Sequence, residues 1–262
     1  MKSLLSILLF AAAAVLSGAC IVYPAKGNIQ FEEGTLEMLI APQFDPAAPP
    51  VKNMEYHGTV FQMDLPGDPY KNHFVMKFWK RKLNTGKISN ELRISLWVDG
   101  KGQGGPSIPV GSWKKGEFHH IAMVWNKGNM TMFSDGKAVW KGKLNFPASM
   151  DPAGIYLLVG SRALWWKKFS KTGREKFLPE ESNPICVAAV KISADARTAD
   201  KFNFKADKLT LLLDDYRKLP AKKGETKPIV ISEEGRMQGM IVGRHATDEK
   251  GIYLYNKKDA EK

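Results

Sequence analysis

The fold of this chain is constrained most by its short segments of alternating apolar and polar residues, which Gly, Pro, Asn and Asp separate. In residues 73–79 the alternation assigns one set of side chains to each face of a strand: His73, Val75, Lys77 and Trp79 to one, and Phe74, Met76 and Phe78 to the other. Similar runs occupy residues 35–40, 92–98, 119–125, 129–133, 155–159, 185–192 and 209–213. Because no long segment has helical periodicity, the pattern predicts an all-β fold of two antiparallel sheets packed as a sandwich.

Turn chemistry predicts two hairpins within this pattern. Asn126-Lys127-Gly128 and Ser134-Asp135-Gly136 each join two alternating runs through residues that tolerate positive φ. The longest helical segments that the sequence supports are single turns near residues 199–202 and 215–219. The charged tail still contains the apolar run 252–255, so we expect a last edge strand there.

The first nineteen residues have the layout of a secretory signal. Lys2 supplies a positive start, Leu4 to Leu16 form an apolar run too short to span a bilayer, and Ser17-Gly18-Ala19 supplies the small residues of a cleavage site. The predicted organisation is therefore a signal peptide at 1–19 and one sandwich over 20–262. The mature protein is expected to be secreted, periplasmic or at the cell surface, without a transmembrane segment.

Two cysteines follow the signal, Cys20 and Cys186, and we expect them to form a disulfide in an exported protein. Residues 16–20 also resemble a bacterial lipobox, although one residue too many separates Leu16 from Cys20. Acylation of Cys20 is the alternative, and it excludes the disulfide because the sulfur would then form a thioether.

The formal charge of +12 indicates anionic partners such as acidic polysaccharide, lipid headgroups or cell-wall polymer. Nucleic acid is not expected as a partner in the exported compartment. The alternative is that the excess of lysine serves solubility alone.

Several segments, in their order, resemble the laminin G-like (concanavalin A-like) jelly-roll family of exported bacterial proteins. The resemblance covers residues 28–195 and rests on Gly34 to Pro42, Trp113 with Glu117 to Trp125, Asn129 to Lys137, Ile155 to Ser161 and Ile185 to Ala194. The chain departs from the family at Phe118, where Trp is usual, and at Cys186 to Val190, where acidic residues are usual. The family's first strand is also missing. The resemblance implies a jelly-roll sandwich in which 208–262 adds strands, with 208–215 lying beside the N-terminal strand.

Enzymes with this type of fold carry signatures that this sequence lacks. No Glu-x-Asp-x-x-Glu strand is present, and the neighbours Glu32-Glu33 and Asp214-Asp215 face opposite ways and are expected to be solvated turn charges. Residues 90–93, Asn-Glu-Leu-Arg, give a fragment of an alginate-lyase strand, but its Gln-aliphatic-His partner strand is missing. No catalytic residues are therefore predicted.

No metal ligands are predicted either. His119 and His120 are consecutive on a strand and so point to opposite faces, which prevents them from binding one ion. We expect no cofactor, although loop carbonyls and single Asp residues suffice for calcium, and the sequence leaves a structural calcium ion open.

The leading binding candidate is the loop after Gly160, because aromatic rings stack on sugars and basic groups attract carboxylate or sulfate. Its candidate residues are Arg162, Trp165, Trp166, Lys167 and Lys168. A second basic and aromatic stretch is 78–82, and the alternative for Trp165 and Trp166 is packing over the sandwich edge. Four other tryptophans are expected in the core or on a sheet face: Trp97, Trp113, Trp125 and Trp140.

The sequence thus predicts an exported, non-catalytic module that binds carbohydrate, with a preference for anionic glycans. The partner would be a polysaccharide or glycoconjugate. The alternative is a structural or adhesive domain that binds a protein of the cell envelope, and a glycoside hydrolase or polysaccharide lyase ranks last.

Overall fold

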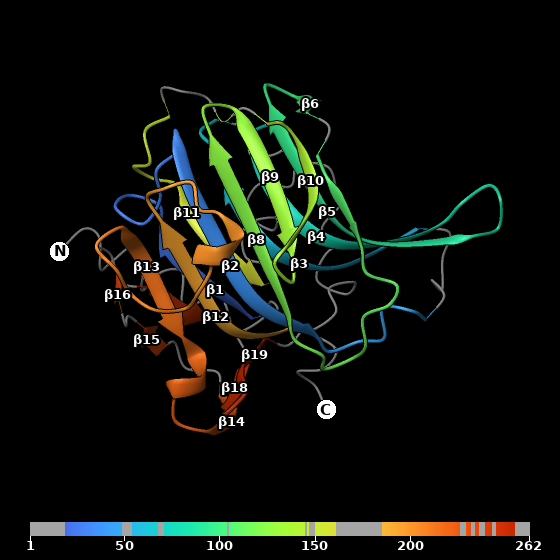
Figure 1. Ribbon diagram of the computed structural model, residues 1–262. Helices are drawn as coiled ribbons and strands as arrows, with labels where there is room; N and C mark the ends of the chain where they lie inside the picture. The colour runs from blue at the N-terminus through green and yellow to red at the C-terminus, as the bar shows by residue number, and fades with distance from the viewer. Residues whose placement is uncertain are drawn as a thin grey trace.

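The computed structural model describes most of the chain between residues 19 and 254. The described residues are 19–48, 54–67, 71–103, 105–144, 146, 150–160, 185–225, 229–231, 234–235, 239–242 and 245–254. In these residues the strands form two antiparallel sheets that pack face to face, with β8 and β9 in front of β3 and β4 in Figure 1.

The first sheet has nine described strands. Across the sheet they are β15 (Ile229–Ile231), β17 (Gly239–Val242), β1 (Cys20–Pro24), β11 (Tyr156–Gly160), β3 (Met54–Asp64), β4 (His73–Lys82), β5 (Ile88–Val98) and β6 (Lys101–Gln103), and β7 (Ser107–Pro109) also pairs with β5. We call this sheet A.

The second sheet, sheet B, has ten described strands. Its main path is β10 (Lys137–Lys143), β9 (Asn129–Ser134), β8 (His119–Asn126), β2 (Glu33–Pro42), β12 (Ile185–Ser193), β19 (Gly251–Leu254), β18 (His245–Asp248) and β14 (Lys222–Glu225). Two more strands leave that path: β13 (Thr210–Asp215) pairs with β12, and β16 (Glu234–Gly235) pairs with β13.

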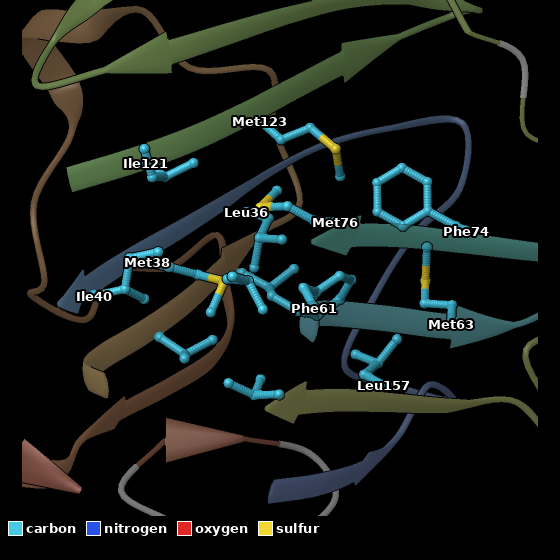
Figure 2. Close-up of a cluster of buried hydrophobic side chains, with 14 of the residues drawn as sticks. Leu36, Met38, Ile40, Phe61, Met63, Phe74, Met76, Ile121, Met123 and Leu157 are labelled. Carbon is cyan, nitrogen blue, oxygen red and sulfur yellow. The ribbon is translucent and has the colours of Figure 1, made fainter. Parts of the chain in front are cut away.

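The core lies between the sheets and is built from the inward half of each alternating run. Leu36, Met38 and Ile40 of β2 face Phe61 and Met63 of β3 across the interior (Figure 2). Burying such side chains contributes roughly 1.5–3 kcal/mol each, which is why the alternation determines which face of each strand turns inward. The prediction of an antiparallel two-sheet sandwich is confirmed.

The predicted turns are confirmed at both hairpins. Lys127 and Gly128 have φ values of 46° and 80°, and Asp135 and Gly136 have values of 50° and 76°. Two residues in succession with positive φ make the turn whose twist matches that of the flanking strands. The two helical turns are present as 3₁₀ helices, η3 (Ala199–Lys201) and η4 (Tyr216–Lys218).

Two expectations about the C-terminal strands are wrong. Residues 210–215 form β13, but it pairs with the late strand β12 in sheet B, whereas the N-terminal strand β1 lies in sheet A. The run at 252–255 contributes β19, which lies between β12 and β18 and so is not an edge strand. Alternation shows that a segment is a strand, but it carries no information about which strand lies beside it.

The structure also contradicts the predicted disulfide between Cys20 and Cys186. Cys20 packs with Leu158 outside the main core, on the outer face of sheet A. Cys186 lies on β12 between Ile185 and Val187, which both face the core, so its thiol points out of sheet B. A disulfide needs Cα atoms within about 7 Å, whereas packed sheets are ~10 Å apart. Both cysteines are free and buried.

Candidate functional site

The leading sequence candidates, Arg162, Trp165, Trp166, Lys167 and Lys168, fall in residues 161–184, outside the part of the chain that the structure describes. Two other sequence signals, the basic and aromatic stretch 78–82 and the fragment 90–93, lie side by side on β4 and β5 of sheet A. The candidate site lies on the outer face of this pair of strands.

The register of β4 and β5 places their outward side chains in rows. His73 lies opposite Trp97, Lys77 opposite Arg93, and Trp79 opposite Glu91. The predicted division of residues 73–79 is confirmed, because Phe74, Met76 and Phe78 belong to the core while Lys77 and Trp79 stay partly exposed. In Figure 1 the β4–β5 hairpin projects from the body of the sandwich.

Two cations and one indole ring come together in these rows. The Lys77 ammonium lies 5.3 Å from the centre of the Trp79 ring, and the Arg93 guanidinium carbon lies 4.7 Å from the same centre. We call Lys77, Trp79 and Arg93 the Trp79 cluster. Like charges opposite each other on neighbouring strands repel, and the negative face of an indole ring offsets this by about 0.5–2 kcal/mol per cation.

Arg93 keeps hydrogen-bonding capacity in this arrangement. Its Nε is buried and has no hydrogen-bond acceptor, and among the described contacts of its guanidinium is the Trp79 ring. The nearest carboxylate by register is Glu91, whose Oε1 accepts a hydrogen bond from the Ser89 hydroxyl. The planar fork of Arg93 is therefore oriented by stacking and can still bind an anion.

Gln62 lies further along the same face, on β3 opposite Val75. Its side-chain nitrogen donates to Asp64 Oδ1, while its buried Oε1 has no hydrogen-bond donor. Gln62 is wholly buried. A buried carbonyl oxygen without a donor costs about 1–3 kcal/mol, but burial keeps this atom out of reach of a surface ligand, so Gln62 is not part of the candidate site.

Trp97 forms a platform at the other end of β5. Its side chain is 39% exposed, and its ring is stacked on His73 with the centroids 6.1 Å apart and the planes 21° apart. The ring also lies against Gly102, where a Cβ would come within 3.2 Å of it. His73 and Gly102 therefore support a ring that presents its remaining surface to solvent.

The basic and aromatic stretch at 78–82 does not act as one unit. Phe78 belongs to the core, and Lys80 is buried with its ammonium donating to the backbone oxygens of Asp45 at 2.7 Å and Ala48 at 2.9 Å. Lys80 thus fixes the loop after β2, and of these three residues Trp79 alone belongs to the candidate site.

The histidine pair on β8 is structural. His119 stacks on Trp113 with the ring centroids 3.9 Å apart and bonds Asp135 at 2.9 Å. His120 points to the opposite face and lies 3.2 Å from Glu37. The prediction that the two rings face opposite ways is confirmed. Although partial burial acts to raise the pKa of Asp135, hydrogen bonds from His119 and from the His120 amide hold it below its ordinary value.

A second charged cluster lies on the outer face of sheet B. The fully buried Lys191 donates to the backbone oxygens of Asn203 at 3.1 Å and Lys205 at 2.6 Å, and Arg197 pairs with Asp195 and Asp207. These bonds hold the segment between β12 and β13 against the sheet. Because the cations are already paired with groups of the chain, this cluster is assigned a structural role.

Asp214 differs from the expectation of a solvated turn charge. It is 3% exposed and accepts a 2.6 Å hydrogen bond from the Tyr23 hydroxyl, which also bonds Tyr216. Burial, with the neighbouring Asp214, raises the pKa of both tyrosines well above the ordinary value. This buried group links the two sheets, while Asp215 caps η4 and pairs with Arg217. The two aspartates do face different surroundings, as predicted.

The described residues contain no group of three or more His, Cys, Asp or Glu side chains placed to hold a metal ion. They also contain no helix of the length and apolar character needed to cross a membrane.

Comparison with known proteins identifies the class of fold. No profile of a known protein family matches the chain, and no curated protein matches its sequence. Among solved structures, a protein from Bacteroides ovatus that has been proposed to bind carbohydrate matches with a TM-score of 0.52 and 14% identity, over 90% of this chain and 60% of that one. The chain thus spans less than two thirds of that relative.

Weaker matches include a pentraxin from Limulus polyphemus, with a TM-score of 0.39 and 15% identity over 70% of this chain and 79% of that one. An alginate lyase from Zobellia galactanivorans matches with a TM-score of 0.32 and 16% identity over 53% of each chain. With the sheet topology, the Bacteroides ovatus match defines the fold as a concanavalin A-like jelly-roll sandwich.

Proposed function

We propose that this protein is an exported laminin G-like module that binds anionic carbohydrate without acting on it, through the outer face of sheet A. The observation that carries the proposal is the Trp79 cluster. There, Lys77 and Arg93 lie opposite each other beside the Trp79 ring, and the side chain of Arg93 is partly exposed and makes no described hydrogen bond.

Each group of the Trp79 cluster has a role that its chemistry supports. The guanidinium of Arg93 can bind a carboxylate or sulfate with two parallel hydrogen bonds, and Lys77 adds a point charge beside it. A bound anion would also remove the repulsion between Lys77 and Arg93, which face each other across the strands. Trp79 contributes an apolar surface for a sugar ring. The net charge of +12 would attract an acidic polymer from a distance.

The arrangement of carboxylates favours binding without hydrolysis. On the described parts of β3, β4 and β5, the acidic residues of this face are Asp64, in the row of His73 and Trp97, and Glu91, in the row of Trp79. Six residues of extended strand separate these rows, which is ~20 Å. Glycoside hydrolysis needs two carboxyl groups within about 5–10 Å, so this pair does not provide an acid and a nucleophile for one bond.

One observation favours the second candidate, a domain that binds a protein of the cell envelope. The β4–β5 hairpin projects from the sandwich, and Ile88 at the start of β5 is 41% exposed. Burial of an apolar side chain against a partner protein is favourable, whereas an aliphatic side chain offers the hydroxyl groups of a sugar no hydrogen bond.

A glycan array probed at two salt concentrations tests the proposal. It compares wild type, Arg93→Gln and the control Lys141→Gln, which removes an exposed charge from β10 on the other sheet. We expect binding to uronate or sulfated glycans that weakens with salt, is lost in Arg93→Gln and is retained in Lys141→Gln. A Trp165→Ala/Trp166→Ala variant tests the predicted loop. Absence of binding by folded wild type would contradict the proposal and favour a protein partner.

A further inference from the structure

We infer that the ligand is a linear chain of several sugars lying along β5, and that Trp97 holds a second sugar at the far end from the Trp79 cluster. This inference rests on the proposed function and specifies the size and direction of the ligand. It depends on a row of four outward side chains, Glu91, Arg93, Ser95 and Trp97, which we call the β5 strip.

The β5 strip is the accessible part of this region. Each of its four side chains is at least partly exposed, and Trp97 is the most exposed at 39%. The neighbouring residues on β4 differ, since His73 is 8% and Val75 is 1% exposed. A ligand that contacts both Arg93 and Trp97 is therefore directed along β5 and not across the sheet.

The outer border of the strip has little side-chain bulk. Gly102 lies against the Trp97 ring, and Gly105 lies so close to the backbone of Ile94 that a side chain there would overlap its carbonyl oxygen. Backbone therefore borders the strip at both positions. Opposite Arg93 and Glu91 the border continues with Ser107 and Pro109 of β7, which are exposed and carry no charge. An extended polymer can therefore lie beside these positions without meeting a charged side chain.

The two ends of the strip offer different chemistry. Arg93, with Lys77 and Trp79, provides positive charge and stacking, whereas Trp97 on His73 provides a stacking surface alone. Arg93 and Trp97 are four residues apart on the strand, and Glu91 and Trp97 are six apart, which gives a strip of ~20 Å. A monosaccharide cannot reach from one end to the other, but an oligosaccharide can.

This arrangement predicts a dependence of affinity on chain length. When one sugar is bound at the Trp79 cluster, a sugar further along the same chain is held near Trp97 at high effective concentration. Affinity should rise steeply once the chain spans both ends and should then level off. Trp97 should contribute only for chains long enough to reach it.

The test uses size-fractionated oligomers of alginate, polygalacturonate and chondroitin sulfate, from disaccharide to octasaccharide, with titration calorimetry. We expect wild type to bind the longer oligomers about tenfold or more tighter than the disaccharide. Trp97→Ala should lose this gain and keep disaccharide affinity within about twofold. Trp97→Phe, which keeps a ring, should retain most of the gain. Trp97→Leu serves as a second variant if Trp97→Ala does not fold.

The outcomes separate this inference from the function on which it rests. Equal affinity for short and long oligomers would overturn the inference that the ligand spans the β5 strip, and so would equal weakening of both by Trp97→Ala. Either result would leave the proposal of anionic glycan binding intact. If wild type binds none of the oligomers or their parent polymers, the proposed function fails and this inference fails with it.

Discussion

At the scale of single residues, Gly34 explains why the early strand begins with Gly-Thr. A side chain at Gly34 would overlap the indole of Trp125, which is 2% exposed and donates to the backbone oxygen of Gln30 at 2.9 Å. The next residue, Thr35, donates to the Asp195 carbonyl at 2.7 Å and accepts from the Arg197 amide at 2.9 Å. The pair therefore positions a core tryptophan and the segment that follows β12.

Gly34→Ala should lower the free energy of unfolding by about 1–3 kcal/mol, because the added methyl group overpacks against Trp125. Denaturant unfolding followed by tryptophan fluorescence measures the effect. Stability equal to that of wild type would show that Trp125 moves without cost and that the close approach is not required.

Asp207 should make stability depend on pH. Burial acts to raise the pKa of Asp207, but hydrogen bonds from the Leu209 amide and from Arg197, with the charges of Arg197 and Lys191, lower it from 3.8 to about 2. Since the folded pKa lies below the unfolded one, the stabilisation is present above about pH 4 and is lost as the pH falls through about 2.

Asp207→Asn should therefore reduce the Tm at neutral pH and approach wild type near pH 2. Thermal unfolding of both proteins from pH 2 to pH 7 measures this. The side chain of Asp207 is 41% exposed, so added salt should shrink the difference at neutral pH. A difference in Tm that stays constant over this range would contradict the role assigned to the charge.

At the scale of elements, the sequence was sufficient where local chemistry decides the structure. The turns at 127–128 and 135–136 and the two faces of 73–79 were predicted because positive φ and alternation are local properties. The sequence does not predict which strands pair with β1, β13 and β19, because strand pairing depends on the packing of the whole sandwich.

The same limit applies to the candidate site. In the sequence, Trp79 and the fragment at 90–93 are separate signals, and the β4–β5 register brings Arg93 of that fragment onto the Trp79 ring. The sequence does not connect them, because it does not specify the register of the hairpin. Trp97 was expected in the core or on a sheet face, and it lies on the sheet face.

The hairpin between β9 and β10 offers a test at this scale. Gly136 has φ of 76°, and nothing lies within 4 Å of where its Cβ would be. Gly136→Ala should therefore cost about 1–2 kcal/mol of unfolding free energy from backbone strain alone. Gly136→Asn, which tolerates this conformation better, should cost less. Equal stability of wild type, Gly136→Ala and Gly136→Asn in denaturant unfolding would contradict the assigned turn.

At the scale of the whole molecule, the two cysteines lie on the outer faces of different sheets. Both are buried, and burial raises the pKa of each thiol to about 12. The thiolate is the reactive form. We therefore expect no labelling of native protein by a thiol reagent, labelling of both cysteines after denaturation, and no change of Tm with reductant.

Mass spectrometry of the labelled protein gives the result. If the denatured protein took up label only after reduction, the two cysteines would be disulfide-bonded, which would contradict the assignment of free thiols. A single label together with the added mass of a lipid would instead support acylation of Cys20, which the lipobox-like segment at 16–20 predicts.

The proposed site for a polymer with negative charge is the Trp79 cluster, on the outer face of sheet A. Affinity electrophoresis of wild type, Arg93→Gln and Lys141→Gln through gels that contain alginate, polygalacturonate or chondroitin sulfate tests it most directly. Loss of a charge-assisted contact costs about 1.5–3 kcal/mol, which is roughly a 10- to 100-fold increase in Kd. We expect one or more of these polymers to retard wild type and Lys141→Gln, and Arg93→Gln to migrate freely through the same gel. Equal retardation of all three proteins would contradict the assigned site, and free migration of wild type in every gel would contradict the function.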